Sequence, residues 1–134
     1  MILRHRLTIR LNHTDAAGLI FFPRLFELVQ ETLEIAMKQR GAPIVERLAS
    51  DGPIMPIAHC EADFRRPLRL GDEVDVEMTC ERIGDKSLTF AYRFLAADGA
   101  EAARARTVHV AMDRRTGAPM PLTEAMRRLA ESAE

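Results

Sequence analysis

Residues 13–34 read HTDAAGLIFFPRLFELVQETLE and place a carboxylate, Asp15, in a turn of small residues just ahead of a helical pattern. After Pro23, apolar side chains recur every three or four residues, and charged side chains take the other side. The apolar positions are Leu25, Phe26, Val29, Leu33, Ala36 and Met37, and Leu28 and Ile35 widen the apolar sector. Pro23 suits a first helical turn and Gly41 suits the position after the last one. The pattern predicts a helix over residues 23–40, wrapped by other elements because its apolar sector is wide.

The segments around this helix alternate between apolar and polar residues as strands do. A first strand is predicted at residues 6–11. From Pro56 the chain places Ala58, Cys60, Ala62 and Phe64 on one face and His59, Glu61, Asp63 and Arg65 on the other. The small apolar face predicts that the helix lies directly across this strand. Turns at Gly71-Asp72, Gly84-Asp85 and Asp98-Gly99 separate three further strands, the last running to about residue 112. A final helix is predicted over residues 123–133, with Thr123 as its N-cap.

One strand, one long helix and then an antiparallel meander predict an α+β architecture. This order resembles that of a hotdog fold, in which an antiparallel sheet of about five strands wraps around a long central helix. The whole chain, residues 1–134, is predicted to form a single domain of this kind. A small sheet with one covered face leaves edge strands open, so a dimer is expected.

Composition excludes several classes of protein. The 19 basic residues are balanced by 20 acidic ones, which argues against a sequence-independent nucleic-acid binder. No apolar run approaches the roughly 20 residues that span a bilayer, and no leader pattern begins the chain, so a cytoplasmic protein without a membrane partner is expected. Cys60 and Cys80 lie in alternating segments without a cluster of metal ligands, which predicts buried thiols rather than a disulfide or a metal site.

Asp15 has two readings from spacing alone. The first N–H groups of the predicted helix lack intrahelical partners and carry partial positive charge, so a carbonyl oxygen bound there would be polarised. Asp15 could then attack the carbonyl carbon or deprotonate a water that does, while Ala16, Ala17 and Gly18 leave room for a substrate. The other reading is structural, because an Asp before a helix is commonly a cap or an Asx turn. Spacing alone favours the structural role.

A family resemblance favours the chemical role instead. The run TDAAG followed by LIFFPRLFELVQETLE resembles the signature of the 4-hydroxybenzoyl-CoA thioesterase family of hotdog proteins. The segment PIAHCEADFRRPLRLGDEVDVE is similar to the family's second and third strands, and GDKSLTFAYRF is similar to its next hairpin. The TDAAG variant is especially similar to the 1,4-dihydroxy-2-naphthoyl-CoA thioesterases within that group.

The resemblance implies an acyl-CoA thioesterase that releases a free acid and CoA, with no metal and no cofactor, because CoA is part of the substrate. Asp15 would be the nucleophile or the general base. The backbone N–H of Phe22, with Gly18, would bind the thioester carbonyl. The implied acyl pocket contains Phe21, Phe22 and His59, and the implied CoA-binding residues are Lys86, Ser87, Arg65 and Arg66. The family also implies a homo-oligomer, with a dimer as the minimal unit and a tetramer expected, and an active site shared across the dimer interface.

Some residues depart from the family, and some alternatives stay open. Many relatives carry an acid where this chain has His13, which is expected to be a solvated loop residue, and His59 could equally have a structural role. The preferred substrate carries an aromatic acyl group, and short or medium-chain acyl-CoA or acyl-carrier-protein thioesters are alternatives. A hydratase on the same fold would use a His near the start of the helix, and FFPRLFE has none. A non-catalytic acyl-CoA-binding subunit is the remaining alternative.

Overall fold

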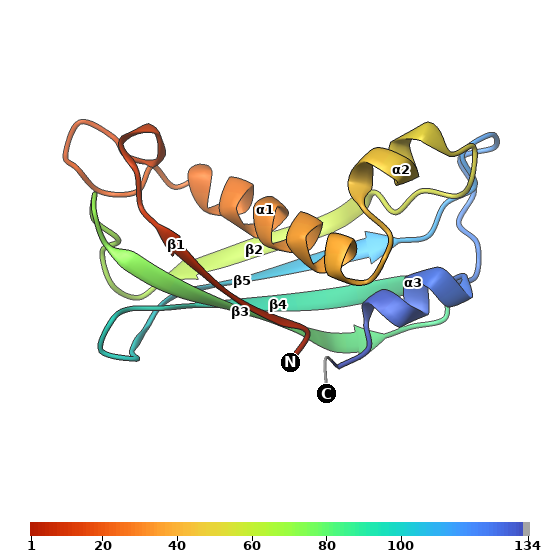
Figure 1. The fold of residues 1–134 in the computed structure, drawn as a ribbon. Coiled ribbons are helices and arrows are strands. Elements are labelled where there is room, and N and C mark those ends of the chain that lie inside the picture. The colour runs from red at the N-terminus through yellow and green to blue at the C-terminus, as the bar shows by residue number, and fades with distance from the viewer. Residues whose placement is uncertain (133–134) are drawn as a thin grey trace.

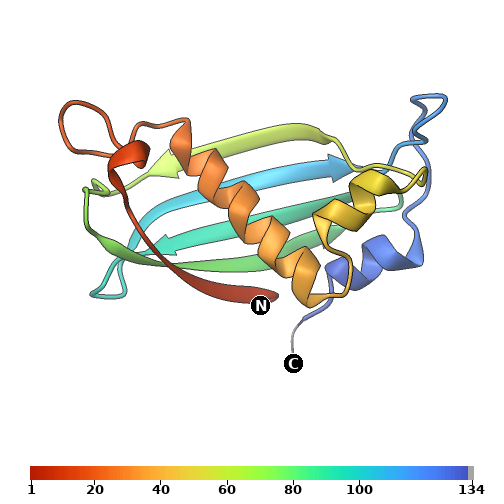
Figure 2. The same ribbon diagram turned by 45° about the horizontal axis from the view of Figure 1, so that its top comes forward.

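The computed structural model of the protein describes residues 1–132, which form five strands, three α-helices and one 3-10 turn. In chain order these are β1 (Leu3–Thr8), η1 (Leu11–His13), α1 (Arg24–Gln39), α2 (Ile44–Ala49), β2 (Ile57–Phe64), β3 (Glu73–Ile83), β4 (Ser87–Leu95), β5 (Glu101–Val110) and α3 (Glu124–Leu129). The strands form one antiparallel sheet in the order β1-β3-β4-β5-β2. Helix α1 runs along one face of this sheet, with α2 and α3 near its C-terminal end (Figures 1 and 2). The predicted α+β architecture is confirmed.

The core lies between α1 and the sheet. Strand β4 buries every second side chain, and the buried set is Leu88, Phe90, Tyr92 and Phe94. Strand β3 adds Val74, Val76 and Met78, and α1 adds Leu25, Leu28, Val29, Leu33 and Ala36. The predicted helix is confirmed to within a residue at each end, and Gly41 follows it with a φ of +76°, a conformation that glycine adopts without strain. No helix within residues 1–132 is long and apolar enough to cross a bilayer.

The opposite face of the sheet is charged. Asp75 accepts hydrogen bonds from Arg6 and Arg4, which hold the pKa of its carboxyl below the usual value. Burial alone would raise the pKa of Glu101, but hydrogen bonds from Arg93 and Arg104 outweigh it and lower that pKa. Such pairs on a solvated face fix side-chain positions more than they stabilise the fold.

The predicted first strand at residues 6–11 is wrong in its bounds. Strand β1 pairs with β3 from Leu3 opposite Met78 to Thr8 opposite Glu73, so it has no ladder partner beyond the start of β3. The residues that follow turn into η1 instead, where the backbone N–H of Arg10 donates to His13 Nδ1 at 2.9 Å. Helix α2 was not predicted, because six residues give too short a periodic signal.

The prediction that the long helix lies across β2 is also wrong, and so is the prediction that both thiols are buried. Strand β2 is an edge strand that pairs with β5 alone, and its residues are exposed except for the half-buried Ala62. Cys60 is therefore exposed. Cys80 is half-buried, and burial raises the pKa of its thiol. The final helix is confirmed with Thr123 as its N-cap, accepting from Met126 N at 3.2 Å, but it ends at Leu129, and residue 133 of its predicted span lies outside the described residues.

Candidate active site

Asp15 lies in a tight loop between η1 and α1. The loop closes on itself because Thr14 and Ile20 form an antiparallel bridge and Asp15 N donates to Leu19 O at 2.9 Å. Gly18 N donates back to Asp15 O at 3.0 Å, and Gly18 holds a φ of +75° that permits this turn. The small residues that the sequence places after Asp15 thus build a turn that bulkier or β-branched residues would strain.

This loop is fixed to the chain that joins β2 to β3. Ile20 N donates to Leu68 O at 2.8 Å, and Leu70 N donates to Gly18 O at 3.0 Å. The side chain of Leu68 is 1% exposed, so the anchoring segment is itself held in the core. A loop bonded at both ends keeps its carboxylate in one place without the help of a ligand, which is the preorganisation that catalysis needs.

The Asp15 carboxylate is exposed to solvent and makes one hydrogen bond. Its Oδ1 accepts from Ala17 N at 2.8 Å, which is the Asx turn of the structural reading. Within residues 1–132 no donor contacts Oδ2, so one carboxylate oxygen stays available to a substrate or a water. The structural and chemical readings of Asp15 are therefore compatible, since one oxygen orients the group and the other faces outward.

His13 has a different environment from the one expected. Its Nδ1 accepts the backbone N–H of Arg10, which closes the 3-10 turn, and its side chain is half-buried rather than fully solvated. Its carbonyl oxygen accepts from Phe21 N at 2.9 Å. His13 thus holds the two ends of the Asp15 loop together.

The N-terminus of α1 begins beside this loop. The N–H groups of Arg24, Leu25 and Phe26 already donate to the carbonyls three residues earlier, whereas Phe22 N–H has no acceptor in the described part of the chain. Pro23 has no N–H to offer and supplies no side-chain cap. The Phe22 amide is therefore the free donor at the positive end of the helix dipole.

The two aromatic rings here are open to solvent. Phe21 is 44% and Phe22 is 66% exposed, and their rings meet edge to face with centroids 5.5 Å apart. Their exposure leaves apolar surface open to a ligand at this place. Both rings adjoin the loop, as the sequence predicted.

The predicted CoA-binding residues fall at two ends of the molecule. Arg65 and Arg66 follow β2 at the end of the sheet that carries the Asp15 loop, where Arg65 pairs with Glu101 at 3.1 Å and Arg66 with Asp98 at 3.0 Å. Lys86 and Ser87 lie in the β3–β4 hairpin at the opposite end (Figure 1). The 16 residues of α1 between these ends span about 24 Å. One chain alone therefore does not bring Lys86 and Ser87 to Asp15.

His59 lies near the start of β2, on the face of the sheet opposite α1. It is paired with Val108 of β5, and its Nε2 is 3.7 Å from Glu61 Oε1. The structure does not bring His59 to Asp15 within one chain, since Phe64 rather than His59 ends the strand on the Asp15 side.

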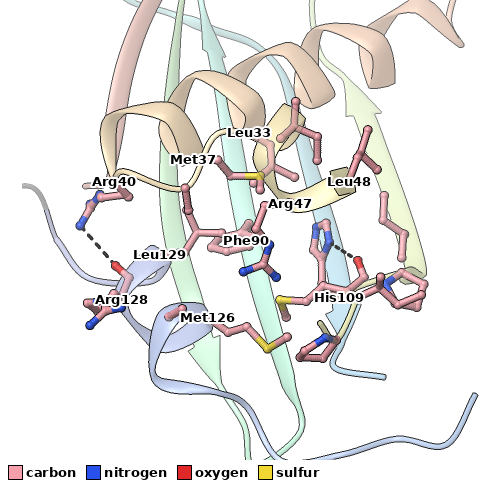
Figure 3. Close-up of a pocket in the computed structure, with 18 of the residues that line it drawn as sticks. Leu33, Met37, Arg40, Arg47, Leu48, Phe90, His109, Met126, Arg128 and Leu129 are labelled. Carbon is pink, nitrogen blue, oxygen red and sulfur yellow. Dashed lines mark hydrogen bonds between the residues drawn. The ribbon is translucent and has the colours of Figure 1, made fainter. Parts of the chain in front are cut away.

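A cavity of about 460 Å³, which was not predicted from the sequence, lies at the C-terminal end of α1 (Figure 3). It is lined by the second half of α1, by α2 and α3, by residues 53–57 and by Phe90 and His109 of the sheet. None of the predicted site residues lines it. The sequence feature that could have indicated this cavity is His109, which continues the alternation of buried Ala103, Ala105 and Thr107 along β5.

His109 is a buried histidine that forms no ion pair within residues 1–132. Its Nε2 lies 2.9 Å from Thr107 Oγ1, its Nδ1 lies 3.4 Å from Met55 O, and its ring packs edge to face on Phe90. Burial lowers the pKa of His109 below its ordinary value, and the contact with the Met55 carbonyl offsets part of that effect. The imidazole is a neutral part of the cavity wall at physiological pH.

A family model described as the thioesterase-like superfamily matches residues 6–129 of this chain. The chain belongs to that superfamily. A 1,4-dihydroxy-2-naphthoyl-CoA hydrolase of Rippkaea orientalis (strain PCC 8801 / RF-1) is 32% identical over 129 residues, which cover 95% of this chain and 94% of that protein. Membership confirms the predicted enzyme class, a thioester hydrolase, and the suspected relationship to the acyl-CoA thioesterases.

Solved structures of such thioesterases have the same fold. A 1,4-dihydroxy-2-naphthoyl-CoA thioesterase from Synechocystis superposes with a TM-score of 0.88 at 21% identity, covering 95% of this chain and 93% of that one. A gentisyl-coenzyme A thioesterase gives a TM-score of 0.84 at 22% identity, covering 96% of this chain and 100% of that one. The hotdog fold of this thioesterase is confirmed. The curated relative and the Synechocystis structure are named for 1,4-dihydroxy-2-naphthoyl-CoA, the subgroup that the TDAAG motif resembles, and not for 4-hydroxybenzoyl-CoA.

Proposed function

We propose that this thioesterase hydrolyses an aromatic acyl-CoA to a free acid and CoA, with Asp15 as the nucleophile or the general base. The observation that carries the proposal is the anchored Asp15 loop, which holds a carboxylate with one free oxygen beside the unpaired Phe22 N–H at the start of α1. The aromatic class is supported by the relatives, which are named for dihydroxynaphthoyl and gentisyl thioesters, and by the exposed Phe21 and Phe22 rings next to the loop.

The chemistry follows from these groups. The thioester carbonyl oxygen accepts a hydrogen bond from Phe22 N–H. The partial positive charge at the N-terminus of α1 stabilises the negative charge that develops on that oxygen, and the turn at Gly18 leaves this end of the helix accessible. In the nucleophilic course, Asp15 attacks the carbonyl carbon and CoA leaves as its thiolate, which takes up a proton from solvent. Water then opens the mixed anhydride to the acid and restores Asp15. In the general-base course, Asp15 removes a proton from a water that attacks the same carbon, the C–S bond breaks to release the CoA thiolate, and the proton on Asp15 passes to that thiolate. Neither course needs a metal or a cofactor.

The complete site requires a second copy of the chain. Strand β2 has one unpaired edge, and its end residues Ile57 and Phe64 are 49% and 45% exposed. Antiparallel pairing of β2 with β2 of a second copy would continue the sheet and cover these side chains. Because such pairing reverses the strand direction, it would place the Asp15 loop of one subunit at the end of the other that carries Lys86 and Ser87. A dimer thus explains why one chain separates the residues that the family implies for CoA binding, and two such dimers would give the expected tetramer.

The test is the release of CoA thiol from a panel of thioesters by the wild type and by Asp15→Asn. The panel contains benzoyl-, hydroxybenzoyl-, dihydroxynaphthoyl-, acetyl-, hexanoyl- and palmitoyl-CoA. The asparagine keeps an oxygen that accepts from Ala17 N–H, so the loop is retained while the base or nucleophile is lost. We expect a fall in kcat of at least about 100-fold for Asp15→Asn on the best aromatic substrate. Asp51→Asn, at an exposed carboxylate outside the loop, is the matched control and should keep the wild-type rate.

Three results would count against the proposal. Turnover that survives in Asp15→Asn would remove Asp15 from the chemistry. A preference for hexanoyl- or palmitoyl-CoA would replace the aromatic class with the aliphatic one. Binding of the thioesters without any release of thiol would assign the protein to the acyl-CoA-binding subunits.

A further inference from the structure

The cavity at the C-terminal end of α1 has an unbalanced charge. Its lining contains four arginines, which are Arg40, Arg47, Arg114 and Arg128, and no Asp or Glu among the residues that the structure describes. The rest of the wall is mostly apolar, with Leu33 and Met37 from α1 and Phe90 from the sheet. A lining that holds four arginines and no carboxylate favours a ligand that brings negative charge.

Three of the four arginines already have partners. Arg40 donates to the carbonyl oxygens of Arg128 and Glu131. Arg114 Nε donates to Gly52 O at 3.1 Å, and Arg128 lies 3.8 Å from Glu124 on its own helix. Arg40 thus joins the end of α1 to α3 and to the chain just after it, and Arg114 joins the segment after β5 to Gly52. The Arg128 side chain is paired only within α3.

Arg47 is different. Its guanidinium makes no hydrogen bond and no ion pair within residues 1–132, although the side chain is half-buried. Figure 3 shows it entering the cavity from α2, in the lining that also contains Phe90 and His109. His109 makes no hydrogen bond to it, because the ring nitrogens of His109 face Thr107 and Met55. A guanidinium carries five donors in a planar fork that matches a carboxylate, and that match strengthens where water is partly excluded.

We propose that this cavity binds a carboxylate-bearing small molecule, with the apolar body of the ligand against Leu33, Met37 and Phe90 and its carboxylate on Arg47. The cavity volume of about 460 Å³ lies within the range of small-molecule sites. The same chemistry has two sources. One is the acyl group of a thioester attacked by Asp15 of a second subunit, which rests on the proposed function and would make Arg47 a specificity residue for acyl groups with a distal carboxylate. The other is a free acid that binds here independently of turnover.

The first experiment measures binding by calorimetry on the full chain, with 4-phenylbutyrate and the uncharged 4-phenylbutanol as probes of equal size. The wild type should bind the acid at least tenfold more tightly than the alcohol, and Arg47→Gln should remove that preference while leaving the affinity for the alcohol unchanged. Arg127→Gln is the matched control, because Arg127 is an exposed arginine on α3 outside the cavity lining. Met37→Trp, which fills the apolar part, should weaken both probes.

Equal affinity of the wild type for acid and alcohol would overturn the proposal, and so would an undiminished preference for the acid in Arg47→Gln. An absence of binding of the acid to the wild type would overturn it as well. None of these affinities depends on turnover, so the binding measurement tests the cavity even if the protein hydrolyses no thioester.

The second experiment separates the two sources. If the carboxylate belongs to the acyl group, 4-phenylbutyrate competes with the best thioester of the panel, and Arg47→Gln raises KM for a thioester with a distal carboxyl group without changing KM for its unsubstituted analogue. If the ligand is a free acid, the acid binds the wild type without raising KM. Competition that is unchanged by Arg47→Gln would contradict both.

Discussion

His109 should make the stability of the fold depend on pH between 7.5 and 5.5. Burial lowers the pKa of His109 from the ordinary value of 6.5, so the unfolded chain takes up a proton at a higher pH than the folded one. The contribution of His109 is therefore complete above pH 6.5 and is lost as pH falls through the folded pKa. At pH 5.5, one unit below the ordinary value, a native histidine that stays neutral costs up to about 1.4 kcal/mol of unfolding free energy.

The assay is urea unfolding followed by circular dichroism at pH 7.5 and 5.5, at one fixed protein concentration. The wild type should lose stability between the two values, and His109→Gln, which cannot take up a proton, should lose little. Carboxylates such as Asp75, Glu101 and Asp113 have lowered pKa values and stay ionised in the folded state over this range. A wild type equally stable at both pH values, or a variant as sensitive as the wild type, would refute the reasoning that His109 is neutral because it is buried.

Two further substitutions test the loop and the core. Gly18→Ala meets no atom within 4 Å but places a side chain at a φ of +75°, so it should lower the unfolding free energy by about 1 kcal/mol, and an unchanged urea midpoint would show that the turn relaxes without strain. Tyr92 is fully buried, and its hydroxyl makes no hydrogen bond of normal geometry, although Thr107 is close enough to affect the pKa of that hydroxyl. Tyr92→Phe should therefore raise the unfolding free energy by about 1 kcal/mol. A loss of the same size would reveal a hydrogen bond to the hydroxyl.

Much of the fold could be predicted because its signals are local. The periodicity of α1, the glycine that ends it and the turn pairs between β3, β4 and β5 are each contained in a few residues. The position of β2 could not be read in the same way. Its alternation identifies the face of Cys60 correctly but carries no information on whether a helix covers that face, because coverage depends on the strand order of the whole sheet.

The site divides along the same line. Asp15, Gly18 and the start of α1 are neighbours in the chain, so their juxtaposition was predictable from one stretch. The cavity is not local, because it joins α1, α2 and α3 to His109, and α2 is too short to give a periodic signal. In the sequence, Arg47 cannot be distinguished from an ordinary solvated arginine, and only the fold places it in the cavity lining.

The length of α1 between the Asp15 loop and the cavity has a consequence for the evolution of such a protein. If the subunits meet along β2, each reaction centre draws its carboxylate from one polypeptide and its acyl-binding wall from another. A mutation in the wall then alters which acid is released without touching the loop that releases it. Mixed assemblies of two damaged copies, one lacking the carboxylate and one lacking the wall, would still contain one intact centre. The spacing along a single helix thus allows the selectivity and the chemistry to diverge as separate traits.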